Sequence, residues 1–297
     1  MIPRDVVVVG DVMLDVVVKP DGDIAPTSDT PSRVALSRGG SAANMAEALA
    51  RAGHRVTYVG ACGDDLAAAL FEGALRDAGI DAFLERTEAT TGVVVAVVDA
   101  AGQRAMMTDR GANSWLESGH VARQLERPFA HLHVSGYTLL DPRTREVGRA
   151  ALASARSLGR STSVDVCSVA PLAALSPALF LEASRGAAML FANEEEALVL
   201  SGCEHIEDAI HELSLEFGEV IVTLGEHGAR ARHEGVDHAV ASSSAGVIDT
   251  TGAGDAASGA YLSVRLGDGS VDEALSAAMS AAAQVVTGLG SRGQSPI

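Results

Sequence analysis

The segment Asp249-Thr250-Thr251-Gly252-Ala253-Gly254-Asp255 carries the strongest structural signal in this chain, because it leads directly into a predicted helix over Ala256–Leu266. The first N–H groups of a helix have no acceptor inside the helix, and the helix dipole makes that end partly positive. The small residues Gly252-Ala253-Gly254 leave space there for a phosphate oxygen. Asp255 would project into the same space, where a carboxylate can take a proton from an attacking hydroxyl. The segment therefore indicates phosphoryl transfer to an alcohol, and a plain strand-to-helix turn with Asp255 as a dipole partner is the alternative.

Lysine is almost missing from the chain. Lys19 is the only lysine among the 22 Lys and Arg residues, and no Gly-Lys-Ser/Thr triplet occurs, so a P-loop is excluded. The stretch Lys19–Asp29 is rich in Pro, Gly and Asp and predicts a turn or flap, whereas protein kinases need a lysine on a strand. Phosphate charge must therefore be met by backbone amides, Mg²⁺ and arginine.

A second motif is Arg38-Gly39-Gly40-Ser41-Ala42-Ala43-Asn44, followed by a predicted helix over Met45–Gly53. Paired glycines before a helix let a small polar ligand approach the backbone closely. Asn44 offers donors and an acceptor to hydroxyl groups, as sugar recognition requires. The alternative is a tight loop in which Asn44 bonds only to the local backbone.

Three further segments complete a series along the chain: Val6-Val7-Val8-Val9-Gly10-Asp11 with Asp15, Asn193-Glu194-Glu195-Glu196, and Val222-Thr223-Leu224-Gly225 with Gly228. Taken with the two motifs above, they stand in the order typical of one family. The chain resembles the ribokinase-like, PfkB-type carbohydrate kinases over nearly its whole length. The resemblance implies an α/β fold of the ribokinase type, with ATP and Mg²⁺ as cofactors.

The resemblance also implies roles for the motif residues. Asp255 would be the general base, and the amides of Gly252, Ala253 and Gly254 would form the anion hole. The sugar would be held by residues of the first two motifs, namely Asp15, Gly39, Gly40, Ser41 and Asn44.

On the nucleotide side, Asn193 and Glu196 match the family's Asn-x-x-Glu, which positions Mg²⁺ and the phosphates largely through water. A helix N-cap with an acidic first turn is the alternative interpretation of this pair. Thr223, Gly225 and Gly228 would line the ATP site, or form only a strand end and its turn. Some relatives bind a monovalent cation such as K⁺ near Asp249, Thr251 and the loop Gly288–Ser295, and the sequence leaves open whether this chain does so.

Three departures from the family pattern bear on the acceptor. Ser41 stands where ribokinase has a lysine, and Ser135-Gly136-Tyr137 stands where ribokinase has a polar or acidic residue near the sugar. The segment Asp165-Val166-Cys167-Ser168 lacks the Asp-Pro-Asn of many sugar-specific members. Ribose is therefore one candidate among several.

Composition is compatible with this class. A length of 297 residues allows one large α/β domain over 1–297, and the net charge of −17 argues against nucleic acid as a partner. No basic amphipathic face or long apolar run suggests membrane binding or a signal peptide. Cys62, Cys167 and Cys203 lack the spacing of a disulfide framework or a zinc site, so we expect a cytoplasmic protein.

Short apolar runs alternate with longer Ala/Leu-rich segments, which predicts a three-layer α/β/α fold with a mostly parallel sheet. The predicted strands are Asp5–Val9, Arg55–Val59, Ala130–Val134, Thr162–Val166, Ala188–Phe191 and Glu219–Thr223. Ligands bind at the carboxyl ends of such strands, and Gly39, Asn193 and Gly225 are predicted to follow these ends. His131 and His133 alternate on one strand and are expected to be buried and hydrogen-bonded rather than a metal pair.

Two segments break this rhythm, at about 12–36 and 92–110, where strand signals flank turns with no helix between them. They predict hairpins that form a small β lid, which would exclude water during phosphoryl transfer and could pair two subunits as a homodimer. Arg104 and Arg110 lie on or beside the lid. Each is either a solvated arginine or a contact for a carboxylate or phosphate on the acceptor.

The combined prediction is an ATP-dependent kinase that phosphorylates a primary hydroxyl of a small sugar or sugar acid, such as a ribose-, fructose- or 2-keto-3-deoxygluconate-like acceptor. One alternative is a nucleoside kinase of the adenosine or pseudouridine type, with Tyr137 or Phe83 stacking on the base, although the aromatic content is only 3%. A catalytically silent sugar- or nucleotide-binding protein is the alternative from another class. A Rossmann dehydrogenase is disfavoured because no GxGxxG follows the first strand.

Overall fold

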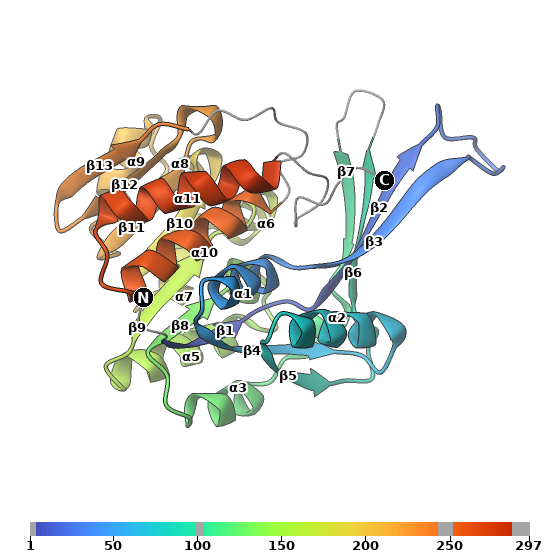
Figure 1. Cartoon of the computed structure of the whole chain (residues 1–297), viewed down its shortest axis with the longest axis horizontal. Coiled ribbons are helices and arrows are strands. Elements are labelled where there is room, and N and C mark those ends of the chain that lie inside the picture. Colours follow the sequence, from blue (N-terminus) through green and yellow to red (C-terminus); the bar gives the residue numbers. More distant parts are fainter. Residues whose placement is uncertain (1–3, 99–103, 243–251, 287–297) are drawn as a thin grey trace.

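The computed structural model describes residues 4–98, 104–242 and 252–286, and it is built around one large sheet (Figure 1). The sheet has nine strands in the order β13-β12-β11-β10-β9-β8-β1-β4-β5. The seven strands from β11 to β5 are parallel. At one edge β12 pairs antiparallel with β11, and β13 pairs antiparallel with β12. The strands are β1 Asp5–Val9, β4 Arg55–Cys62, β5 Asp81–Arg86, β8 His131–Val134, β9 Ser161–Asp165, β10 Met189–Asn193, β11 Glu219–Thr223, β12 Ala229–His233 and β13 Val236–Val240.

Helices cover both faces of this sheet, because its central strands are apolar on both sides. Val6 and Val8 belong to one buried cluster, and Val7 and Val9 belong to the other. The first cluster is closed by α1 Ser41–Arg51, α2 Leu66–Asp77, α10 Ala253–Leu266 and α11 Val271–Val286. The second is closed by α3 Ser118–Leu125, α4 Gly136–Leu140, α5 Arg145–Ser157, α6 Val169–Leu175, α7 Pro177–Ala183, α8 Glu194–Ser201 and α9 Ile206–Leu213. The predicted three-layer architecture is confirmed.

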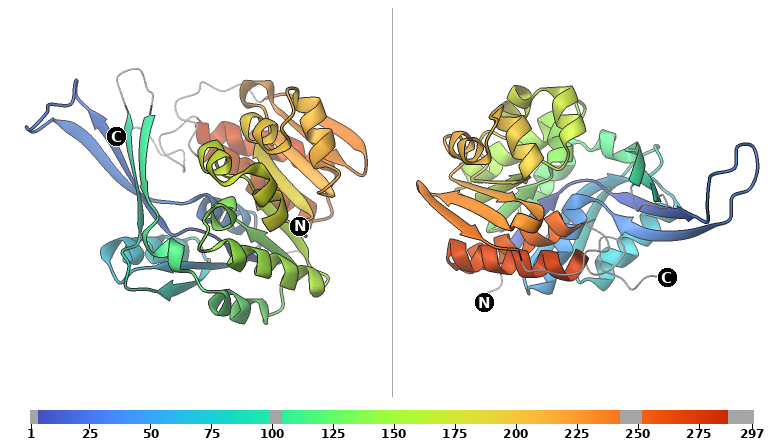
Figure 2. Two further views of the ribbon diagram at one scale, coloured as in Figure 1. Left: turned by 180° about the vertical axis from the view of Figure 1, so that it is seen from behind. Right: turned by 90° about the horizontal axis from the view of Figure 1, so that it is seen from above.

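A separate four-stranded sheet has the order β3-β2-β6-β7. Its strands are β2 Met13–Pro20, β3 Ser32–Gly39, β6 Gly92–Val98 and β7 Arg104–Asp109. The two predicted hairpins are present, and a parallel pairing of β2 with β6 joins them into one sheet. Figures 1 and 2 show this sheet projecting from the body, with the β2–β3 hairpin reaching farthest. We call this sheet the lid.

Some elements differ from the prediction. Gly39 ends the lid strand β3, so the expectation that it follows a strand of the parallel sheet is wrong. Strands β5, β12 and β13 were not predicted, because their sequences mix polar and apolar residues at the edges of the sheet. Helix α10, which was predicted to begin at Ala256, begins at Ala253.

Two helices that lie far apart in the sequence meet at the site side of the sheet. A Cβ atom added at Gly259 of α10 would lie 2.6 Å from the Cβ atom of Ala48 of α1, so the helices approach closely where the glycine stands. The first turns of the two helices also meet, because Ser41 and Asn44 of α1 contact Asp255 of α10. Among the residues that the structure describes, no helix has the length and apolarity needed to cross a membrane.

Candidate active site

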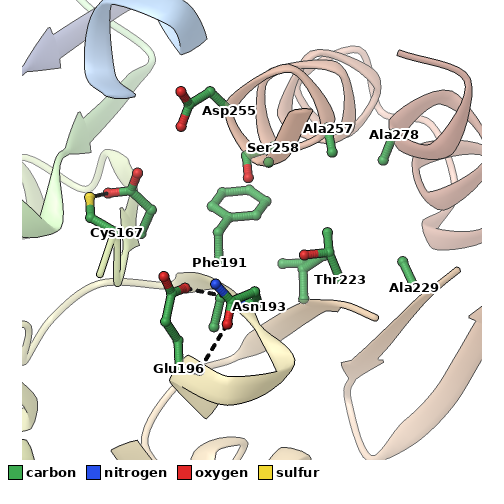
Figure 3. Close-up of a pocket in the computed structure, with 14 residues that line it drawn as sticks. Cys167, Phe191, Asn193, Glu196, Thr223, Ala229, Asp255, Ala257, Ser258 and Ala278 are labelled. Carbon is green, nitrogen blue, oxygen red and sulfur yellow. Dashed lines mark hydrogen bonds between the residues drawn. The ribbon is translucent and has the colours of Figure 1, made fainter. Parts of the chain in front are cut away.

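A cleft of about 150 Å³ opens at the carboxyl ends of β9, β10 and β11, beside the start of α10 (Figure 3). Its lining includes Asp165, Cys167, Phe191, Ala192, Asn193, Glu196, Ile221, Thr223, Ala229, Gly254, Asp255, Ala257, Ser258 and Ala278. In Figure 3, Asp255 lies at the start of α10, while Cys167, which follows β9, and Glu196, in the first turn of α8, lie across the cleft. The cleft therefore occupies the edge where a parallel sheet binds its ligands.

Two side chains of α1 contact the Asp255 carboxylate. Asn44 Nδ2 donates to its Oδ2 at 2.8 Å, and Ser41 Oγ lies 2.7 Å from its Oδ1. Burial raises the pKa of Asp255 to about 6, although its hydrogen-bonding contacts with Asn44 and Ser41 lower it. A carboxyl with such a pKa can hold or release a proton near neutral pH, as a general base must.

The helix start beside Asp255 has the expected open geometry. Gly252 is the N-cap of α10 and has φ 76°, a left-handed conformation that favours glycine. A Cβ atom at Gly254 would meet no atom of the described residues within 4 Å, so these residues leave the first turn open to a ligand. The structure thus places Gly252, Ala253 and Gly254 where an anion can approach them.

The lid and α1 bring the predicted sugar-side residues together. A Cβ atom at Gly39 would lie 1.9 Å from Oδ1 of Asp15, and one at Gly40 would lie 2.6 Å from the carbonyl oxygen of Asp11. Gly40 also has φ 95°. Burial raises the pKa of Asp15 to about 6, against the effect of Arg38. The paired glycines thus let the lid strand β3 turn into α1 while Asp15 packs against them.

Arg110 has partners within its own chain. Its Nη1 and Nη2 atoms donate to the two carboxylate oxygens of Asp11 at 2.6 and 3.0 Å, and its Nε donates to Asp141 Oδ2 at 3.0 Å. The guanidinium carbon lies 5.9 Å from the ring centre of Tyr137. The expectation of a solvated lid arginine is wrong for Arg110, because two carboxylates hold it at the base of the lid. The side chain of Arg104 lies outside the described residues.

Asn193 and Glu196 form a reciprocal helix cap. Asn193 Oδ1 accepts from the Glu196 amide at 2.9 Å, and Glu196 Oε2 accepts from the Asn193 amide at 2.9 Å. Burial, with smaller contributions from the nearby Asp165 and Asp255, raises the pKa of Glu196 to about 7. The capping interpretation is confirmed, and it leaves Glu196 beside the cleft. Among the described residues, no group of three acidic, histidine or cysteine side chains is placed to hold a metal ion directly.

The remaining predicted residues divide into two groups. Thr223 lines the cleft, and Gly225 and Gly228 follow it with φ 58° and 92° in the turn between β11 and β12. A Cβ atom at Gly228 would lie 2.0 Å from the carbonyl oxygen of Val240, so this glycine allows a close backbone approach. Asp249, Thr251 and the loop 288–295 lie outside the described residues.

Asp165 is a cleft residue to which the sequence interpretation gave no role. Its Oδ2 lies 2.7 Å from Ser41 Oγ, and its Oδ1 accepts from the Gly136 amide at 2.8 Å and from the Cys167 thiol at 3.0 Å. Cys167 itself has φ 72°, which is unusual for a residue with a side chain. The sequence signal that could have identified Asp165 was its position, because it lies at the carboxyl end of the predicted strand Thr162–Val166 and is the last residue of β9.

Comparison of the chain with known proteins identifies the class to which this fold and cleft belong. The model of the pfkB family carbohydrate kinases matches residues 3–297, and the chain therefore belongs to this family of kinases. The ribokinase of Haemophilus influenzae is 29% identical over 272 residues, which cover 88% of this chain and 85% of that protein. The resemblance inferred from the motifs is confirmed.

Solved structures support the same assignment. The adenosine kinase from Sinorhizobium meliloti has a TM-score of 0.88 and 25% identity, and the match covers 98% of this chain and 96% of that one. The Arabidopsis thaliana ribokinase, solved with ribose and ATP, has a TM-score of 0.82 at 21% identity, covering 99% and 96%, and shows the likeness of the fold. The chain is thus a kinase with the ribokinase-like fold, similar to kinases that act on sugars or nucleosides.

Proposed function

We propose that this kinase transfers the γ-phosphoryl group of ATP to a primary hydroxyl of a small sugar or sugar-like acceptor, with Asp255 as the general base. The supporting observation is the position of Asp255, a carboxylate with a raised pKa at the open start of α10 on the wall of the cleft. Phosphoryl transfer is also supported by the relatives of the chain, which include a ribokinase and an adenosine kinase. A silent binding protein would have no need of this arrangement.

In the proposed mechanism, the acceptor hydroxyl lies between Asp255 and the γ-phosphate. Asp255 takes the hydroxyl proton as the acceptor oxygen forms a bond to phosphorus, the bond from phosphorus to the β–γ bridging oxygen breaks, and ADP leaves. The amides of Gly252, Ala253 and Gly254 stabilise the charge on the transferred group. Asp15, Gly39, Gly40 and Asn44 hold the acceptor from the lid and α1.

ATP fits the residues of the cleft, and it would bring Mg²⁺ with it. Thr223 and the Gly225–Gly228 turn line the nucleotide side, while Glu196 faces the phosphate position. A single carboxylate suits a cation that keeps most of its waters and binds chiefly to substrate phosphates, where it neutralises their charge. The monovalent-cation site at Asp249 and Thr251 stays a prediction.

The charges around the acceptor side favour a neutral sugar over a sugar acid. Arg110, the cation best placed to meet an acceptor carboxylate, is already bound by Asp11 and Asp141. Arg38 is buried in an ion pair with Glu47. Carboxylates around the acceptor position would therefore repel an anionic acceptor, whereas the hydroxyl groups of a ribose- or fructose-like sugar can donate hydrogen bonds to them. A 2-keto-3-deoxygluconate-like acid is the less favoured acceptor.

A nucleoside acceptor is the second candidate, because the similar adenosine kinase shares the fold and Tyr137 lies near Arg110 at the acceptor side. Phe83 does not serve this role. It lies on the edge strand β5, and the Arg127 guanidinium lies 4.3 Å from its ring centre.

A substrate panel separates these acceptors. We expect ADP release from ATP and Mg²⁺ with neutral pentoses or hexoses, weaker or no release with 2-keto-3-deoxy sugar acids, and loss of release in Asp255→Asn. Turnover only with nucleosides would replace the sugar proposal by the nucleoside one. ATP binding without turnover on any acceptor would favour the silent binding protein.

We further propose that the lid pairs two subunits, with the whole chain acting as one kinase domain. On the lid face opposite Asp15, the strand register places Leu36, Val16, Val95 and Met107 in one row. Leu36 and Met107 are 60% and 56% exposed, which suits a partner surface. We expect a dimer by light scattering, and a monomer for Leu36→Glu combined with Met107→Glu. A parent protein that stays monomeric at high concentration would contradict this.

A further inference from the structure

The Ser41 hydroxyl connects two carboxylates of the cleft. Its Oγ lies 2.7 Å from Asp165 Oδ2 and 2.7 Å from Asp255 Oδ1. A hydroxyl has one hydrogen to donate, and an ionised carboxylate can only accept. The second short contact therefore needs a hydrogen from one of the two carboxyl groups. In this arrangement the pair Asp165 and Asp255 holds one proton.

The surrounding donors place that proton on Asp255. Asp165 accepts from the Gly136 amide and from the Cys167 thiol in addition to Ser41. Asp255 accepts from Asn44 on its other oxygen. The carboxylate with more donors is the better anion, so Asp255 donates to Ser41 and Ser41 donates to Asp165.

A buried chain of serines and histidines faces Asp165 from β8 and β9. His133 Nε2 lies 3.8 Å from Asp165 Oδ1 and has no hydrogen-bond partner among the described residues. His133 Nδ1 lies 2.9 Å from Ser163 Oγ, which lies 2.8 Å from His131 Nε2, and His131 Nδ1 lies 2.6 Å from Ser161 Oγ. Burial lowers the pKa of His133, and it lowers that of His131 to about 3, so both rings are neutral.

One hydrogen-bond direction satisfies the three short contacts of this chain. Because Asp165 can only accept, His133 presents its Nε2–H towards it, and its Nδ1 then accepts from Ser163. Ser163 in turn accepts from His131 Nε2–H, and His131 Nδ1 accepts from Ser161. The order follows from the same-face positions of these residues on two paired parallel strands. This hydrogen-bond direction points the Nε2–H group of His133 at Asp165. The expectation that both histidines are buried and hydrogen-bonded is confirmed.

We propose that Asp165 is a positioning residue for the base: it shares one proton with Asp255 through the Ser41 hydroxyl in the ligand-free enzyme, and the serine–histidine chain holds it as the charged member. Asp255 must then lose this proton before it can take the proton of an acceptor hydroxyl. The inference rests on the proposed role of Asp255.

Other ionisable groups face this cluster, and each has a defined place. They are Arg38 at the end of β3, Asp11 after β1, Tyr137 of α4, Cys167 after β9 and Glu196 of α8. Arg38 lowers the pKa of Asp255, whereas the dominant burial effect and Asp165 raise it. Of the ionisable groups in the part of the chain that the structure describes, only Asp165 is joined to Asp255 through one shared hydroxyl. Its charge is therefore the one to remove.

The test compares pH profiles of kcat/KM, which report the ionisation of the free enzyme. In Asp165→Asn, which keeps the size of the side chain and an acceptor oxygen but removes the charge, we expect the acid limb to move down by roughly one pH unit. Asp165→Ala should show the same shift. If Asp165 is only structural, the Asn variant will keep the parent profile while the Ala variant loses activity and thermal stability, and the inference is then wrong.

A second measurement does not depend on turnover. In ligand-free protein with ¹³C-labelled aspartate, the carboxyl resonance that is absent from Asp255→Asn should titrate at lower pH in Asp165→Asn than in the parent. An unchanged titration would overturn the shared proton. An active Asp255→Asn enzyme would instead overturn the proposed base, so the two failures are distinguishable.

Discussion

Asp255→Asn is expected to lower kcat by about 10²- to 10⁴-fold, the usual contribution of a positioned general base. The amide cannot accept the hydroxyl proton, while the proposed anion site at the start of α10 and the proposed nucleotide side of the cleft keep their residues. Steady-state kinetics with the best acceptor, together with ATP titration by calorimetry, will separate the loss of chemistry from the loss of binding. We expect the dissociation constant for ATP to stay at the parent value.

Thermal unfolding supplies the control for this variant. The pKa of Asp255 is about 6 in the folded protein, above the value of about 3.9 for an unperturbed aspartate. Folding therefore favours the protonated form, and this contribution to stability is lost as the pH rises through about 6. Near neutral pH the neutral amide should unfold at the same temperature as the parent or higher. Lower stability together with lower activity would indicate misfolding instead of a missing base.

Gly39→Ala should raise KM for the acceptor by about 10- to 100-fold, because the added methyl group displaces Asp15. A Cβ atom at Gly39 would lie 1.9 Å from Asp15 Oδ1, and this contact cannot persist. Asp15 lies on the lid strand β2, away from the nucleotide side, so KM for ATP should not change. Initial rates at varied acceptor and ATP concentrations measure the two constants separately.

Gly73→Ala is a matched control for this substitution. Gly73 lies within α2, and a Cβ atom there would meet no other described residue within 4 Å. Alanine in a helix should leave both KM values unchanged and stabilise the protein slightly. If Gly39→Ala shows the same kinetics as this control, Asp15 does not hold the acceptor.

Several features were determined by the sequence alone, because their physical causes are local. The open start of α10 follows from the glycines beside Asp255, whose small size and backbone freedom need no distant partner. The parallel sheet follows from apolar runs that can be buried only between two helical layers. The lid hairpins follow from strand signals without an intervening helix. These patterns were sufficient to indicate the kinase family.

The tertiary structure decided which polar groups pair, because pairing depends on contacts between residues distant in sequence. Ser41 lies 124 positions from Asp165 and 214 from Asp255, yet its hydroxyl contacts both carboxylates. Arg110 is bound by Asp11, which lies 99 positions away, so a lid arginine that the sequence left open to an acceptor anion is occupied. A motif identifies a residue type and its local backbone, whereas burial and hydrogen-bond partners, which set proton affinity, arise only when the helices and strands pack together.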